Sequence, residues 1–190
     1  KGTNEISASY AALDIEGSAY FKGEGTLILN GGEVGFINPT NFSEKKVIIE
    51  SGTYIINSED VGVQSNSATW SQTGGKIEIN CKGDAVVGRD IRFTGGKFTA
   101  NGSLVATSKI AISHANLTVK SEKAALISER TIAINGARIE SAGKAVEEYN
   151  GENEINIVAL SRERTTSMLF GKNVGIFADY LVLILAALIV

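Results

Sequence analysis

The chain has 190 residues, enough for one domain with a hydrophobic core and too few to argue for two large ones. Its 18 basic and 21 acidic side chains are intermixed and give a net charge of −3. This excludes the basic stripe of a typical nucleic-acid-binding protein, so we expect no nucleic-acid partner. One cysteine excludes an internal disulfide framework, and 21 glycines against one proline predict frequent tight turns.

The N-terminal stretch is interpreted as a degenerate first coil of a repeat, because Ile6 lies 21 residues before the apolar Leu27. Asp14 and Glu16 lie two positions apart in a predicted strand, which places their Cα atoms roughly 7 Å apart on one face. Such a pair can bind a cation or serve as the carboxylates of a glycosidase. It is also common on exposed strands, so we predict no metal site and keep Asp14 and Glu16 as weak candidates.

Six eight-residue segments share one pattern: the first and last residues are apolar, and the sixth is glycine or alanine. Their starts are 19 to 23 residues apart. The segments are LILNGGEV from Leu27, VIIESGTY from Val47, WSQTGGKI from Trp70, IRFTGGKF from Ile91, IAISHANL from Ile110 and IAINGARI from Ile132.

The pattern has a direct explanation in strand geometry. Apolar residues at positions 1 and 3 share one face of a strand, the small residues at 5 and 6 form a turn, and apolar residues at 8 and 10 begin a second strand. A third apolar stretch follows in most repeats. We therefore predict an all-β, right-handed parallel β-helix over residues 1–160, with about 21 residues per coil and roughly seven to eight coils. An antiparallel sandwich would not require a fixed period.

The outward positions of the predicted repeat carry polar side chains. The column at position 7 combines cations with hydrogen-bonding groups, and the column at position 9 lies beside it. We expect an acidic polysaccharide to bind along these columns through Lys76, Lys97, Asn116 and Arg138 together with Thr99 and Thr118. A solvated face without a ligand explains the same residues. The complete columns read Glu33, Thr53, Lys76, Lys97, Asn116 and Arg138 at position 7, and Glu78, Thr99, Thr118 and Glu140 at position 9.

Two further residues, His114 and Cys81, carry side chains that can be reactive. His114 replaces a turn glycine, and we expect an exposed residue with positive φ there rather than a catalytic base. Cys81 follows the second predicted strand, and we expect it to be a small packing residue. With one histidine and one cysteine we predict no catalytic residues and no imidazole–thiolate metal centre.

The C-terminal part differs in composition. Residues 161–173 are predicted to be a linker, and residues 174–190 contain Asp179 as their single charge. Seventeen residues in a helix span roughly 25 Å, slightly less than the hydrocarbon core of a bilayer. We predict a transmembrane helix that continues beyond Val190. A buried core helix is the alternative.

The motifs GTN at 2–4, AALDIEG at 11–17 and FKGEGTL at 21–27 resemble the opening of clostridial-type surface proteins known as carbohydrate-binding domain-containing β-helices. Their coils repeat a similar I-x-I-x-G-G-x-[IFV] phrase, and the resemblance spans about residues 2–157. It implies a pectate-lyase-like solenoid that binds polysaccharide without cleaving it, in some members with calcium. This sequence has no clear acidic calcium loop.

These observations predict a monomeric, exported module, anchored in the membrane at the cell surface, that binds a polysaccharide or cell-wall glycan without catalysis. A structural or adhesin stalk is the first alternative. An enzyme resembling polysaccharide lyases or glycoside hydrolases is the second.

Overall fold

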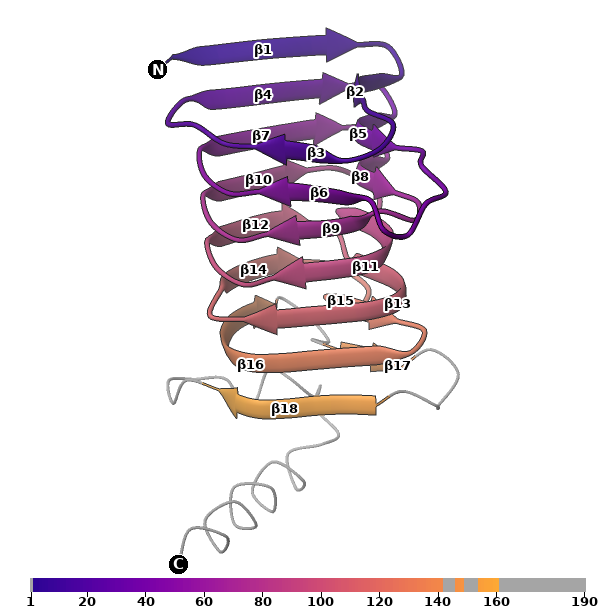
Figure 1. The fold of residues 1–190 in the computed structure, drawn as a ribbon, viewed down its shortest axis with the longest axis vertical. Coiled ribbons are helices and arrows are strands. Elements are labelled where there is room, and N and C mark those ends of the chain that lie inside the picture. Colours follow the sequence, from indigo (N-terminus) through magenta and orange to yellow (C-terminus); the bar gives the residue numbers. More distant parts are fainter. Residues whose placement is uncertain (1, 142–145, 149–153, 161–190) are drawn as a thin grey trace, which may run out of the picture.

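The computed structural model describes residues 2–141, 146–148 and 154–160, and every regular element among them is a β-strand. The strands form a parallel β-solenoid of about six turns with about 23 residues per turn. Figure 1 shows the coils stacked along one axis, with β1 at one end and β18 near the other.

Each coil passes through three faces in the same order. Face A contains β1 (Thr3–Ala8), β4 (Thr26–Gly31), β7 (Thr53–Ser58), β10 (Lys76–Asn80), β12 (Lys97–Asn101), β14 (Asn116–Lys120) and the second half of β16 (Thr131–Ser141). Face B contains β2 (Ala11–Asp14), β5 (Val34–Asn38), β8 (Val61–Ser65), the first halves of β11 (Val86–Phe93) and β13 (Leu104–Ser113), β15 (Leu126–Ser128) and β17 (Val146–Glu148). Face C contains β3 (Ala19–Phe21), β6 (Lys46–Ile49), β9 (Thr69–Gln72), the second halves of β11 and β13, the first half of β16, and β18 (Glu154–Leu160).

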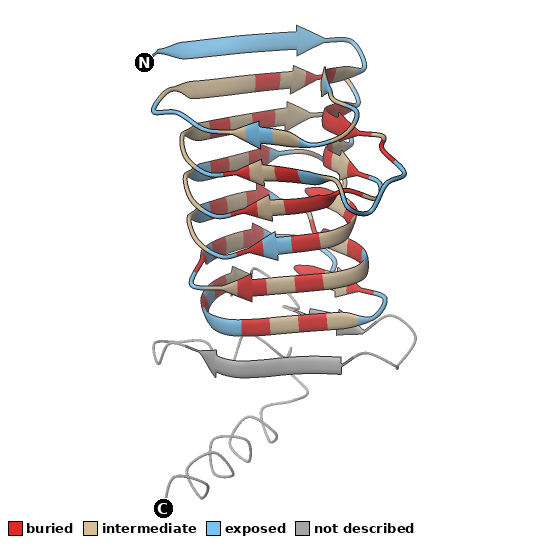
Figure 2. Ribbon diagram, viewed as in Figure 1, coloured by how far each residue is buried: buried red, intermediate tan, exposed pale blue. Residues whose placement is uncertain are grey.

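The interior of the solenoid is filled by the side chains that the repeat predicts to be inside. Figure 2 shows buried residues alternating with more exposed ones along the strands of the middle coils. On face A, Ile77 and Ile79 are buried, as are Phe98 and Ala100 on the next coil. Parallel strands pack their apolar side chains against a buried core. Here the inner sides of the three faces enclose one continuous hydrophobic core.

Five of the six repeat segments have the predicted register. Val47 pairs with Trp70, Trp70 with Ile91, Ile91 with Ile110, and Ile110 with Ile132, all in parallel on face C. The stretches predicted as third strands are also present, as β8, β11, β13 and β15.

The repeat pattern predicts that the segment beginning at Leu27 is equivalent to the one beginning at Val47, and this prediction is wrong. Leu27 lies in β4 on face A and pairs with Tyr54, whereas the residue paired with Val47 is Ala19. The LILNGGEV motif resembles the repeat because its Gly31–Gly32 turn, between faces A and B, resembles the turn between faces C and A. Ile6 accordingly pairs with Leu29 and not with Leu27.

This misassignment added a coil start and made the predicted coils too many and too short. From Thr26 to its partner Thr53 the chain takes 27 residues, because residues 39–45 form a loop between β5 and β6. The predicted linker 161–173 and transmembrane helix 174–190 lie outside the described residues. Within the part of the chain that the structure describes, no helix has the length and apolarity that a membrane crossing requires.

Candidate functional site

The predicted cationic column lies on the outer side of face A. Lys76 pairs with Lys97, Lys97 with Asn116, and Asn116 with Arg138. All four side chains are exposed, and the inward neighbours Ile77 and Phe98 keep the register fixed by their burial. The order of the column from Thr53 onward is as the sequence predicts, but the residue that precedes Thr53 is Thr26 and not Glu33.

The second predicted column runs beside the first. Thr99 pairs with Thr118, and the two threonines are flanked by Glu78 on β10 and Glu140 on β16. Each of these side chains is partly exposed. Neighbouring strands in a sheet are about 4.8 Å apart, so the two columns present a regular array of polar groups. We call the exposed side chains of Lys76, Lys97, Asn116, Arg138, Thr99 and Thr118 the polar strip.

Acidic side chains neutralise the cations at the two ends of the polar strip. The Nζ atom of Lys76 lies 3.5 Å from a carboxylate oxygen of Glu78, and Arg138 bonds to Glu140 in the same way. Among the described residues Lys97 has no ion pair. The repulsion expected between Lys76 and Lys97 is therefore reduced within the protein, and Lys97 is the cation that can best accept an anionic ligand.

Lys120 extends this surface and was missed by sequence reasoning. It lies at the end of β14, paired with Asn101, and like Lys97 it has no ion pair within the described ranges. Strand rise and spacing place its Cα roughly 14 Å from that of Lys97. The sequence does contain a signal for Lys120. The eleventh residue, counted from the start of each segment, is asparagine in three repeats and lysine in the repeat that begins at Ile110.

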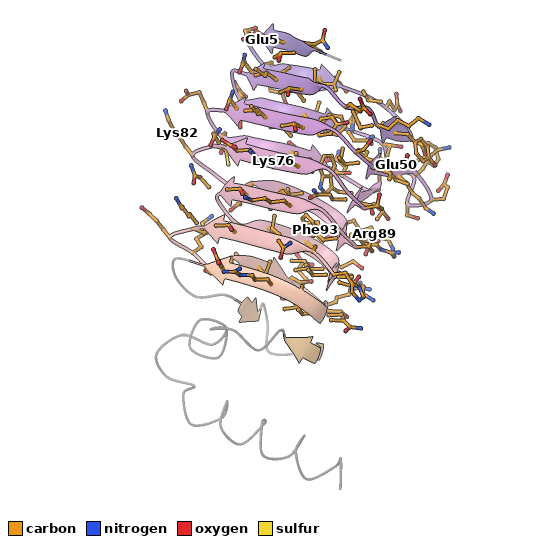
Figure 3. The ribbon with its side chains drawn as sticks, turned by 90° about the vertical axis from the view of Figure 1, so that its left-hand side faces the viewer. Glu5, Glu50, Lys76, Lys82, Arg89 and Phe93 are labelled. Atoms are coloured by element: carbon orange, nitrogen blue, oxygen red, sulfur yellow. The ribbon has the colours of Figure 1, made fainter. Side chains whose placement is uncertain are left out.

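A cavity of about 260 Å³ adjoins Lys120 at the corner between faces A and B. Two more lysines line it, but each is paired: Lys82 with Glu59 and Lys123 with Asp84, the latter at 3.5 Å. Lys76 and Lys82, both labelled in Figure 3, come from face A and from the corner loop that follows it. Among the described cations of face A and this corner, Lys97 and Lys120 are thus the two without an ion pair.

Asp14 and Glu16 do not share a strand. β2 ends at Asp14, and Glu16 follows in the connection to β3. Both carboxylates are exposed. Among the described residues no three His, Cys, Asp or Glu side chains are grouped as metal ligands would be.

His114 and Cys81 have the positions that the sequence predicts. His114 is exposed, with φ of 52°, in the corner turn before β14. Cys81 is half-buried, and its thiol donates to the carbonyl oxygen of Asn101 at 2.8 Å. Burial, reinforced by the carboxylates of Asp84 and Asp60, raises the pKa of Cys81 to about 11. We therefore assign His114 to a turn and Cys81 to packing at the end of a strand.

No protein-family model, curated protein or solved structure matches this chain. The resemblance to clostridial-type surface β-helices is supported at the level of the fold, since the chain is a parallel β-solenoid. Carbohydrate binding is therefore argued below from the surface of the solenoid.

Proposed function

We propose that the protein is a non-catalytic module that binds an acidic polysaccharide along face A. In this proposal the module is exported and held at the cell surface by the apolar segment 174–190. The observation that carries the proposal is the charge of Lys97 and Lys120, which lie on adjacent strands of a regular outward face and have no ion pair among the described residues.

The geometry of the polar strip suits an extended polymer. Its columns run across the strands, and successive residues within a column are about 4.8 Å apart, close to the length of one sugar unit in an extended chain. Lys97 contacts a carboxylate of the polymer, while Asn116, Thr99 and Thr118 offer amide and hydroxyl groups to neighbouring sugar hydroxyls. Because strand pairing fixes the backbone of the strip, binding costs ordering entropy in the exposed side chains and not in the backbone.

The test is affinity electrophoresis of the detergent-solubilised full chain in gels containing polygalacturonate or a neutral glucan. We expect retardation by polygalacturonate that weakens with salt, and no retardation by the glucan. Lys97→Asp and Lys120→Asp should each weaken binding about tenfold, since each replaces an attraction with a repulsion. Lys46→Asp, the same charge change on face C, is the matched control.

Three results would contradict the proposal. Equal weakening by Lys46→Asp and Lys97→Asp would show a general charge effect without a site. Absence of binding to polygalacturonate would favour the alternative of a structural or adhesin stalk. Release of reducing ends or unsaturated products from polygalacturonate would instead favour the enzymatic alternative.

A further inference from the structure

The first corner between faces C and A is longer than those that follow it. Four residues, 22–25, connect Phe21 to Thr26, whereas three residues connect the equivalent positions Ile49 and Thr53 on the next coil. The corners at 73–75 and 94–96 also have three residues. In repeat proteins, an insertion in one coil typically forms a loop on a binding face.

The longer corner lines an open cavity of about 370 Å³. β3 and β4, which this corner connects, lie near the N-terminal end of the solenoid (Figure 1). The cavity volume is within the usual range of ligand pockets, roughly 300–1,000 Å³. Its apolar floor comes from Phe21, Leu27 and Tyr54. Its polar wall comes from Asn4, Lys22 and Glu24, whose two charges are opposite.

The loop and the floor are held in place by contacts with the neighbouring coil. The backbone N–H of Gly23 donates to the hydroxyl of Ser51 at 3.0 Å, and that of Thr53 donates to the carbonyl of Gly25 at 3.0 Å. The rings of Phe21 and Tyr54 pack edge to face, with centroids 5.9 Å apart. The cavity is therefore formed before any ligand arrives.

Tyr20 supplies the feature that distinguishes this cavity from the one beside Lys120. It lies on the outer side of β3, is 61% exposed and lines the cavity. An exposed tyrosine beside hydrogen-bonding groups suits a ligand with one apolar face and several hydroxyls, as in a pyranose ring. Because Lys22 and Glu24 are the charged residues of the lining and have opposite signs, the lining has no net charge, and the cavity favours an uncharged ring over a uronic acid.

We infer that this cavity binds one uncharged sugar unit of a glycan, stacked on Tyr20. The inference rests on the proposed glycan-binding function, but it uses different residues from the polar strip. The volume of the cavity admits a single sugar or a disaccharide. The cavity therefore recognises a sugar unit, whereas the polar strip recognises the charge of the polymer.

The test is saturation-transfer NMR of the detergent-solubilised full chain with methyl glycosides of glucose, galactose, N-acetylglucosamine and galacturonate. We expect transfer to at least one uncharged glycoside and a dissociation constant about tenfold higher in Tyr20→Ala. Tyr20→Phe, which keeps the ring, should bind like the parent. Tyr10→Ala is the matched control, because Tyr10 is 53% exposed and lies outside this cavity.

Transfer to none of the uncharged glycosides, transfer to galacturonate alone, or unchanged binding by Tyr20→Ala would each overturn the inference. Thermal unfolding of Tyr20→Ala should match the parent, since the side chain points outward. Retardation by polygalacturonate that is lost in Lys97→Asp, with no glycoside binding, would leave the proposed function standing and remove this site. Glycoside binding without retardation by polygalacturonate would instead leave this site standing and remove the proposed function.

Discussion

The side-chain amide of Asn80 donates to the amide oxygen of Asn57 on the preceding coil, at 3.0 Å. Asn57 in turn donates to Asn30 at 2.7 Å, and the nitrogen of Asn30 bonds to Glu5 at 2.6 Å. The three amides and the carboxylate of Glu5 thus form a ladder across four strands of face A. Each rung links adjacent coils, so the ladder resists sliding of one coil against the next.

Replacing the middle rung should destabilise the solenoid. Asn57→Ala removes one donated and one accepted hydrogen bond, for an expected loss of about 1–2 kcal/mol in the free energy of unfolding. Denaturant titration measures this loss. Asn101→Ala is the matched control, since Asn101 ends β12 and its side chain has no hydrogen bond within the described residues. Equal losses in both variants would show that the ladder contributes nothing specific.

The inward and outward sides of β12 should differ sharply in their tolerance of charge. Phe98 is 1% exposed, so Phe98→Asp buries a carboxylate that must be desolvated or protonated, and we expect a loss of more than about 3 kcal/mol. Ile110→Asp on face C should do the same. Lys97→Asp, one residue from Phe98 but outward, should change stability by less than about 0.5 kcal/mol.

Thermal melts of these three variants check the register. A loss for Lys97→Asp as large as that for Phe98→Asp would contradict the outward position of the polar strip. Since each coil contacts only its neighbours, the damage in Phe98→Asp should also spread to adjacent coils.

A stabilising substitution is expected at His114. Its φ of 52° lies in the left-handed region, which disfavours residues with a Cβ, and the equivalent residue on the next coil is Gly136, with φ of 60°. His114→Gly should raise the melting temperature, with a gain of about 1 kcal/mol or less because glycine also loosens the unfolded chain. Gly136→Ala is the opposite change and should lower the melting temperature.

The thiol of Cys81 should react slowly in the folded protein. With the pKa raised from 9.0 to about 11, the thiolate fraction at pH 8 falls roughly a hundredfold, and thiolate is the nucleophile. Iodoacetamide labelling in buffer should therefore be far slower than in urea. Because the pKa is higher in the folded state, the thiol favours folding below about pH 9, and that contribution is lost as the pH rises toward 11. Equal labelling rates in buffer and in urea would contradict this prediction and show that Cys81 is accessible in the folded protein.

Much of the fold was determined locally and could be predicted from the sequence. The apolar positions around Trp70, Ile91, Ile110 and Ile132 recur at regular intervals because each coil repeats the same strands and corners, and each residue must face the same core. The residues on the outer side of face A follow from the same register by alternation, which is why the order Lys76, Lys97, Asn116, Arg138 was predicted.

The first coil escaped prediction because its repeat is interrupted. The true counterpart of VIIESGTY begins at Ala19, with one extra residue in the corner at 22–25, and a fixed-length pattern cannot align it. The motif at Leu27 matched by length and glycine content although it belongs to another face. For the same reason the fixed-length pattern does not align Asn30 with Asn57 and Asn80, the other amides of the ladder.

What only the tertiary structure decided was which polar groups are left for a ligand. The sequence by itself determined that Lys76, Lys97 and Arg138 lie in one column, because strand alternation is a local rule. It could not determine that Lys76 and Arg138 are paired while Lys97 is not, since rotamers and neighbours decide an ion pair. Nor could it determine the cavity beside Tyr20, whose floor at Phe21 and Tyr54 comes from two different coils brought together by stacking.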